Sequence, residues 1–230
     1  MPPAPRFRRY DWGKGQDWLT SLGPEDGRSI LIVPPLFEEL NRTRKLLSDL
    51  MRALAGRGIG AHLPELPGTG ESETILADAN WDDWKAAVAA ASNVCDAGAV
   101  VAVRGGCLLD TAHQGEKTLR FAPVEGKRLI RDLVRSRSVT DKAFDAEAQK
   151  AVFVTGPTML GGYPIGAELA CAVRDAEPRS GSSVTVVRLE GDRGEADSHI
   201  AGAPLWRRAE PTGDPALSGA LADNIAAWLS

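Results

Sequence analysis

The segment AVVAVRGGCLL, residues 99–109, places an arginine where a buried strand turns into a helix. A strand-turn-helix elbow presents its turn residue at the carboxyl end of the sheet, where proteins of the α/β class bind ligands. Arg104 is cationic at any ordinary pH and offers five donors and no acceptor, so it suits binding of a carboxylate or phosphate. It cannot attack a carbonyl group, so the elbow predicts anion binding at a place where an enzyme could carry a nucleophile.

Two carboxylates follow an earlier strand, in the segment VPPLFEELN. Two prolines end the strand, and Glu38, Glu39 and Asn41 open the next helix. Carboxylates in a first helical turn oppose the positive end of the helix dipole, so simple capping is one interpretation. If the strand lies beside the one before Arg104, Glu38 or Glu39 could form a partly buried ion pair with that arginine. Such a pair would leave less charge for a ligand.

Apolar runs of strand length alternate with helix-like patterns along the chain. The runs cover residues 30–33, 59–63, 99–103, 118–121, 151–154 and 184–189. Helical periodicity predicts helices over residues 41–54, 81–95, 126–134, 167–176 and 215–229, and a helix start after the elbow. This alternation predicts an α/β fold with a mostly parallel sheet covered by helices on both faces. With 230 residues the chain can form one such domain, residues 1–230.

Two stretches interrupt the alternation. Residues 137–150 are polar, and residues 156–164 are rich in glycine and proline. Together they predict a lid or insertion over residues 137–165, near the crevice at the end of the sheet. A second polar stretch, residues 191–198, predicts an exposed loop after the last long strand.

Composition excludes several classes of function. A net charge of -4 with 25% charged residues argues against nucleic acid as the main partner. Three widely spaced cysteines in apolar surroundings suit reduced thiols in a cytoplasmic protein and predict no metal site. The start of the chain carries prolines and charges where a signal peptide is apolar, and no stretch approaches the roughly 20 apolar residues that span a bilayer. We expect a cytoplasmic protein without a membrane span or cofactor, and the sequence names no protein partner.

Several motifs together carry a family resemblance. The runs VPPLFEELNRTRKLLSDL, LPELPGTGES, FAPVEGKRLIRDLVR, GYPIGAELA and PLWRRAEP, with the elbow among them, resemble the exosortase A system-associated hydrolases. These are α/β-hydrolase-fold proteins linked to bacterial exopolysaccharide and protein-sorting gene clusters. The resemblance covers nearly all of residues 30–229 and implies an α/β-hydrolase fold with a small lid insertion. It also implies hydrolysis of an ester or thioester.

The resemblance places Arg104 at the serine position of G-x-S-x-G, with Ala102 in place of the first glycine. Backbone N–H groups near Leu36 and Phe37, with that of Gly105, would form the oxyanion hole. Donors of this kind can hold an anion even where the serine is lost. The resemblance therefore implies a hydrolase architecture without its nucleophile.

The other two members of a Ser-His-Asp triad are also in doubt. Glu190, at the end of VTVVRLE, falls near the acid position, although a surface glutamate is the alternative interpretation. His199 precedes IAGAPLW and is expected to be structural, because no serine is present for it to activate. Cys107 lies three residues into the predicted elbow helix, so we expect it to pack in the core.

Three functions remain open. The first is a degenerate hydrolase, a pseudoenzyme that binds an anionic acyl, carboxylate or phosphate ligand through Arg104 and the amino end of the elbow helix. The second is a working ester or thioester hydrolase in which Glu190 or Glu39 activates water and Arg104 stabilises an oxyanion. The third is an interaction scaffold whose crevice is filled by the Glu–Arg pair. The residues favour the first or the third, and the resemblance favours the second.

Overall fold

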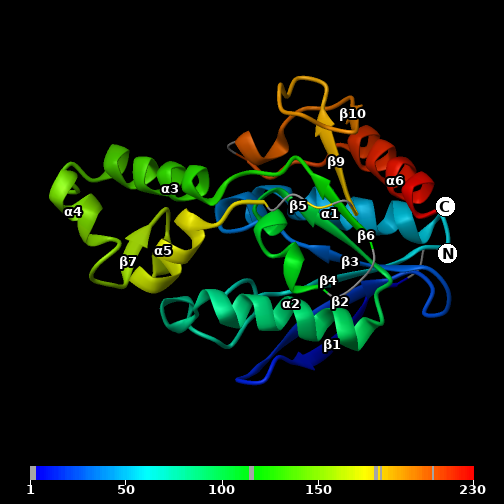
Figure 1. Ribbon diagram of the computed structural model, residues 1–230, viewed down its shortest axis with the longest axis horizontal. Helices are drawn as coiled ribbons and strands as arrows, with labels where there is room; N and C mark the ends of the chain where they lie inside the picture. The colour runs from blue at the N-terminus through cyan, green and yellow to red at the C-terminus, as the bar shows by residue number, and fades with distance from the viewer. Residues whose placement is uncertain (1–3, 114–116, 179–180, 182, 209) are drawn as a thin grey trace.

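An eight-stranded sheet forms the centre of the molecule in the computed structural model, which describes residues 4–113, 117–178, 181, 183–208 and 210–230 (Figure 1). The strand order is β1-β2-β4-β3-β5-β6-β9-β10. The strands are β1 (Arg6–Asp11), β2 (Gln16–Leu22), β3 (Ser29–Val33), β4 (Gly60–Pro64), β5 (Ala99–Val103), β6 (Lys117–Phe121), β9 (Val184–Leu189) and β10 (Ser198–Ile200). From β4 to β10 every pairing is parallel, and β2 is antiparallel to both of its neighbours. The predicted, mostly parallel sheet is confirmed.

Helices cover both faces of this sheet. On one face α1 (Glu38–Ala55) packs beside α6 (Pro215–Leu229), and on the other lies α2 (Trp81–Cys95) (Figure 1). The side chains at Leu46, Leu50 and Leu54 are fully buried, as their spacing of four residues predicts for one face of a helix. Among the described helices, none is long and apolar enough to cross a membrane.

Between β6 and β9 the chain leaves the sheet and forms an arm, residues 126–175 (Figure 1). It consists of α3 (Gly126–Thr140), α4 (Ala146–Ala151), a hairpin of β7 (Thr158–Leu160) and β8 (Tyr163–Ile165), and α5 (Ala167–Asp175). Residues 137–165, for which the sequence predicts a lid or insertion, lie within the arm, and this segment starts inside α3. The predicted strand over residues 151–154 is wrong. Ala151 ends α4 and residues 152–154 follow it as hydrogen-bonded turns, and a short apolar run does not distinguish strand from helix.

The helix predicted after the elbow is also wrong. The chain forms two short 3-10 segments instead, η2 (Arg104–Leu108) and η3 (Asp110–Ala112). The carboxylate of Asp110 accepts hydrogen bonds from the Arg120 guanidinium on β6, with Nε–Oδ2 at 2.5 Å and Nη2–Oδ1 at 2.9 Å, and both side chains are buried. The two consecutive glycines disfavour a regular helix, because glycine has low helix propensity. The Asp110–Arg120 pair then holds the end of the 3-10 turns against β6. No helix amino end is therefore available to bind an anion here.

A buried histidine joins the antiparallel and parallel parts of the sheet. His62 on β4 lies with Nδ1 2.8 Å from Oγ of Ser21 on β2. Burial, together with the charges of the nearby Arg8 and Arg6, lowers the pKa of His62 from its ordinary 6.5 to about 4. Between pH 6.5 and about 4, the imidazole therefore stays neutral in the folded state, whereas it takes up a proton in the unfolded chain.

We expect this histidine to make stability depend on pH. Its contribution is fully present above pH 6.5 and is lost as the pH falls toward about 4, because only the unfolded state gains the proton. Urea unfolding across this range should show a shallower loss of unfolding free energy in His62→Asn than in the unmodified protein. Identical slopes in the two proteins would contradict the assignment.

Candidate functional site

Arg104 stands at a sharp backbone turn at the carboxyl end of β5. Its φ of 53° is left-handed, a conformation that costs an L-residue with a side chain roughly 1–2 kcal/mol. The next two glycines allow the turn to pack closely against the end of β3. A Cβ added at Gly106 would lie 2.4 Å from the carbonyl oxygen of Val33 and 2.5 Å from that of Pro34. The turn therefore presents Arg104 at the end of the sheet, as the sequence predicts.

The Arg104 guanidinium is held on two sides. Its Nε lies 3.2 Å from Oε2 of Glu39 and its Nη2 lies 2.7 Å from Oε1, which is a two-pronged ion pair. Its Nη1 donates to the carbonyl oxygen of Ala122 at 2.9 Å. The arginine side chain is 8% exposed and that of Glu39 is 16% exposed. Of the two carboxylates that the sequence left open, Glu39 forms the pair and Glu38 does not.

Trp206 covers the same guanidinium. This residue lies in η4 (Leu205–Arg207), in the connection that follows β10, and its ring centre is 4.4 Å from Cζ of Arg104. Such stacking of a cation on an aromatic face contributes about 0.5–2 kcal/mol. The indole is buried, and its Nε1 has no hydrogen-bond partner among the described residues. The ion pair and the stack fix the position of Arg104.

The first turn of α1 also binds the arm. The Tyr163 hydroxyl, on β8, accepts a hydrogen bond from Nδ2 of Asn41 at 2.7 Å and donates to Oε2 of Glu38 at 3.4 Å. Its ring meets that of Phe37 edge-on, with centroids 5.7 Å apart. Burial and the neighbouring Glu38 raise the pKa of Tyr163 to about 12. Glu38 also pairs with Arg42 at 3.1 Å.

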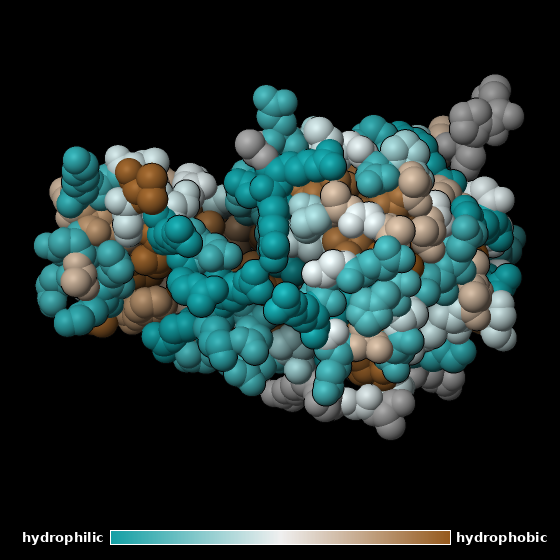
Figure 2. Space-filling view, turned by 90° about the horizontal axis from the view of Figure 1, so that it is seen from above, coloured by the Kyte–Doolittle hydropathy of each residue, from teal (hydrophilic) through white to brown (hydrophobic). Residues whose placement is uncertain are grey.

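A cavity of about 500 Å³ opens above Arg104. Figure 2 shows a hollow between the arm and the body, brown in its depth and teal around its mouth. The apolar wall consists of Leu36, Phe37, Leu129, Leu133, Val139 and Trp206. The charged residues around it are Arg42, Arg104, Arg128, Arg135, Arg207, Glu38, Glu39 and Asp132. Five arginines against three carboxylates give this cavity a positive excess of two, although the whole chain has a net charge of -4.

The three residues expected to supply backbone donors lie together. Leu36 and Phe37 line the cavity, and a Cβ added at Gly105 would lie 2.9 Å from Cγ of Leu36. Cys107 is buried nearby, donates its S–H to the carbonyl oxygen of Ala102, and has a pKa raised by burial. That environment makes Cys107 a core residue.

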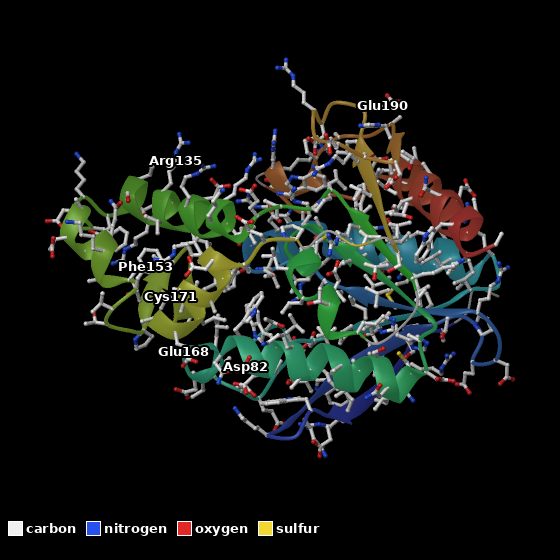
Figure 3. The ribbon with its side chains drawn as sticks, in the orientation of Figure 1. Asp82, Arg135, Phe153, Glu168, Cys171 and Glu190 are labelled. Carbon is white, nitrogen blue, oxygen red and sulfur yellow. The ribbon has the colours of Figure 1, made fainter. Side chains whose placement is uncertain are left out.

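Glu190 lies away from this cavity. It is exposed in the turn after β9, and Figure 3 shows it at the tip of that strand, apart from Arg135 on the arm. The carboxylate closer to the elbow is Asp192, which accepts a hydrogen bond from Nη1 of Arg188 at 2.8 Å. Burial alone would raise the pKa of Asp192, but a bond from the Gly194 N–H and the charge of Arg188 lower it, with Arg104 contributing. Only the polar composition of residues 191–198 signals this residue in the sequence.

Side chains that bind metal ions are not clustered in the described part of the chain. No group of three or more His, Cys, Asp or Glu side chains is arranged there to hold a metal ion.

Solved structures share this architecture over the whole chain. Alpha/beta hydrolase domain-containing protein 10 from mouse matches with a TM-score of 0.64 and 13% identity, covering 98% of this chain and 100% of that one. The chain has the α/β-hydrolase fold. An esterase from Thermogutta terrifontis matches this fold with a TM-score of 0.58 and 15% identity, covering 97% and 98% of the two chains. A thioesterase domain from the curacin biosynthetic pathway matches with a TM-score of 0.54 and 12% identity, covering 98% and 99%.

The relationship is structural. No family model matches the sequence, and no curated protein matches it either. The identities of 12 to 15% establish the α/β-hydrolase fold and leave the reaction to be argued from the site.

Proposed function

We propose that this chain is a non-hydrolytic α/β-hydrolase-fold protein that binds an anionic ligand in the cavity between the arm and the elbow. The observation that carries the proposal is Arg104 itself, locked at the elbow by Glu39 and Trp206. In this fold the nucleophile sits at the elbow, and the acid and the histidine follow in that order along the chain. We infer that Arg104, the loop with Asp192, and Trp206 take the corresponding places in this chain, since Arg104 follows β5, Asp192 follows β9, and Trp206 follows β10. An indole is a donor only and cannot serve as a general base.

The charge of the cavity supports an anionic ligand. Glu39 neutralises Arg104, so the other arginines around the mouth would bind the charged group of the ligand. Arg104 then serves as part of the floor, where its contacts hold the elbow and the first turn of α1 together. Backbone donors near Leu36, Phe37 and Gly105 would complete the polar part of the site.

The alternatives have less support. A hydrolase that uses Glu190 would need that carboxylate at the cavity, but it is exposed at the tip of β9. Glu39 is committed to two hydrogen bonds from Arg104 and has less freedom to activate water. A pure scaffold with a filled crevice fits poorly with an open cavity of about 500 Å³ above the ion pair.

The biological setting forms part of the proposal. The resemblance to the exosortase A system-associated hydrolases favours a role beside exopolysaccharide synthesis or protein sorting. A cytoplasmic location agrees with three cysteines that form no disulfide.

Hydrolysis assays test the absence of catalysis. We expect the unmodified protein, Arg104→Ser and Glu190→Gln to give only background release from short acyl p-nitrophenyl esters and acyl thioesters. We expect Arg104→Ser to stay inactive, because the Trp206 ring that lies against residue 104 has no acceptor with which to activate the serine. An active esterase of this fold, assayed in parallel, controls for substrate quality. Turnover by the unmodified protein that disappears in Glu190→Gln or in Asp192→Asn would overturn the proposal.

A further inference from the structure

Two arginines of α3 face the cavity. Arg128 and Arg135 are seven residues apart, which is two helical turns, so they lie on one side of α3 about 10.5 Å apart along its axis. Both are exposed, and Figure 3 shows Arg135 extending from α3. Arg207, also exposed, reaches the same cavity from η4 on the opposite wall. Three guanidinium groups on two walls therefore surround one opening.

The other charges around the opening are already paired. Glu39 binds Arg104 at 2.7 Å, and Glu38 binds Arg42 at 3.1 Å. Asp132 lies 3.9 Å from its nearest cation, Arg131 on the same helix. Within the described part of the chain, Arg128, Arg135 and Arg207 have no carboxylate within 4 Å. These three arginines, offset by the carboxylate of Asp132, give the cavity its positive excess of two.

The depth of the cavity has a different character. Leu36, Leu129 and Leu133 line it, together with the Trp206 ring. At the outer end of α3, Val139 is 76% exposed and extends the apolar wall toward the mouth. A cavity that is apolar in its depth and charged at its mouth suits a ligand with an apolar part and a charged group at one end.

We propose that the ligand is a phosphate ester with an apolar tail. Its phosphate lies among Arg128, Arg135 and Arg207, and its tail lies along the leucines of the depth. A carboxylate is satisfied by one two-pronged guanidinium, whereas a phosphate monoester has more charge and three free oxygens for several arginines to share. This inference rests on the proposed function and assigns it a ligand class.

Calorimetric titration with four probes tests the class. The probes are decyl phosphate below its micelle-forming concentration, decanoate, decanol and inorganic phosphate. We expect decyl phosphate to bind at least about tenfold more tightly than each of the others, because only it satisfies both the arginines and the apolar wall. Equal affinities for decyl phosphate and decanoate would overturn the phosphate assignment and leave anion binding standing. Binding of decanol alone would overturn both this inference and the proposed ligand.

Variants of exposed arginines locate the phosphate. We expect Arg128→Gln and Arg135→Gln each to weaken decyl phosphate binding about tenfold, which corresponds to one charge-assisted contact. Arg131→Gln is the matched control, because Arg131 is also exposed on α3 but lines a different hollow. The affinity of Arg131→Gln for decyl phosphate should equal that of the unmodified protein. If the two test variants bind as Arg131→Gln does, the phosphate is not held by α3 and the inference fails.

The phosphate ester could be a free metabolite or a lipid headgroup. Co-sedimentation with phosphatidylcholine vesicles, with and without phosphatidic acid, distinguishes the two sources. Capture by the phosphatidic acid vesicles that is lost in Arg135→Gln supports a lipid phosphate. Binding of free decyl phosphate without vesicle capture supports a soluble ester. Capture that Arg135→Gln does not change, with no binding of free decyl phosphate, would overturn the inference.

Discussion

Replacing Arg104 by methionine should lower the free energy of unfolding by about 2–4 kcal/mol, because it leaves the partly buried carboxylate of Glu39 without its partner. The change also removes the donor to the Ala122 carbonyl and the stack on Trp206. Methionine retains much of the side-chain volume, so the loss reports polar contacts more than a cavity. Urea unfolding followed by circular dichroism gives the measurement.

The double variant Arg104→Met with Glu39→Met should recover part of this loss, because replacing both partners of a buried pair by apolar groups is often nearly neutral. Arg131→Met supplies the matched control. The side chains of Arg131 and its partner Asp132 are 70% and 61% exposed, so the cost should stay below about 1 kcal/mol. A double variant no more stable than Arg104→Met would show that the ion pair is not the source of the effect.

Gly106→Ala is expected to destabilise the protein by about 3 kcal/mol or more, because the new methyl group meets backbone that cannot yield locally. Carbonyl oxygens of Val33 and Pro34 lie 2.4 Å and 2.5 Å from the position of the added Cβ. Thermal unfolding of the variant and of Gly98→Ala makes the comparison. Gly98 is exposed, and its added Cβ meets nothing within 4 Å, so its variant should differ from the unmodified protein by less than about 0.5 kcal/mol.

If Gly106→Ala and Gly98→Ala unfold at the same temperature, the close approach of Gly106 to the carbonyl oxygens does not limit the stability of the elbow. A large effect confined to Gly106→Ala would instead show that contact with the end of β3 holds the elbow in place.

Periodicity in the sequence predicted the elements that bury one continuous face. The leucines of α1 and the uniformly apolar β5 predict helix and strand directly, since each side chain's environment follows from its spacing. The Arg104–Glu39 pair was predictable as one of two alternatives. The order of adjacent strands brings the two loops together, and only the conformation of the first turn of α1 selects Glu39 over Glu38.

Other features depend on contacts that no local pattern records. The strands β1 and β2 were missed because β1, RFRRYD, is a charged edge strand without apolar alternation. The 3-10 turns after the elbow depend on the pairing of Asp110 with Arg120 on another strand. Trp206 was not predicted as a site residue, because its approach to Arg104 depends on how the connection after β10 folds back. Asp192 lies in a loop whose polarity predicts exposure and nothing more.

The first turn of α1 connects two parts of the molecule that lie far apart in the chain. Glu38 and Asn41 hold the arm through the Tyr163 hydroxyl, and Glu39, between them, holds the elbow. A movement of the arm away from the body must either break the two tyrosine hydrogen bonds or rotate this turn. Rotation would draw Glu39 away from Arg104 and free a guanidinium beneath the cavity. Opening of the arm would therefore change the charge of the cavity floor as long as the two tyrosine hydrogen bonds hold.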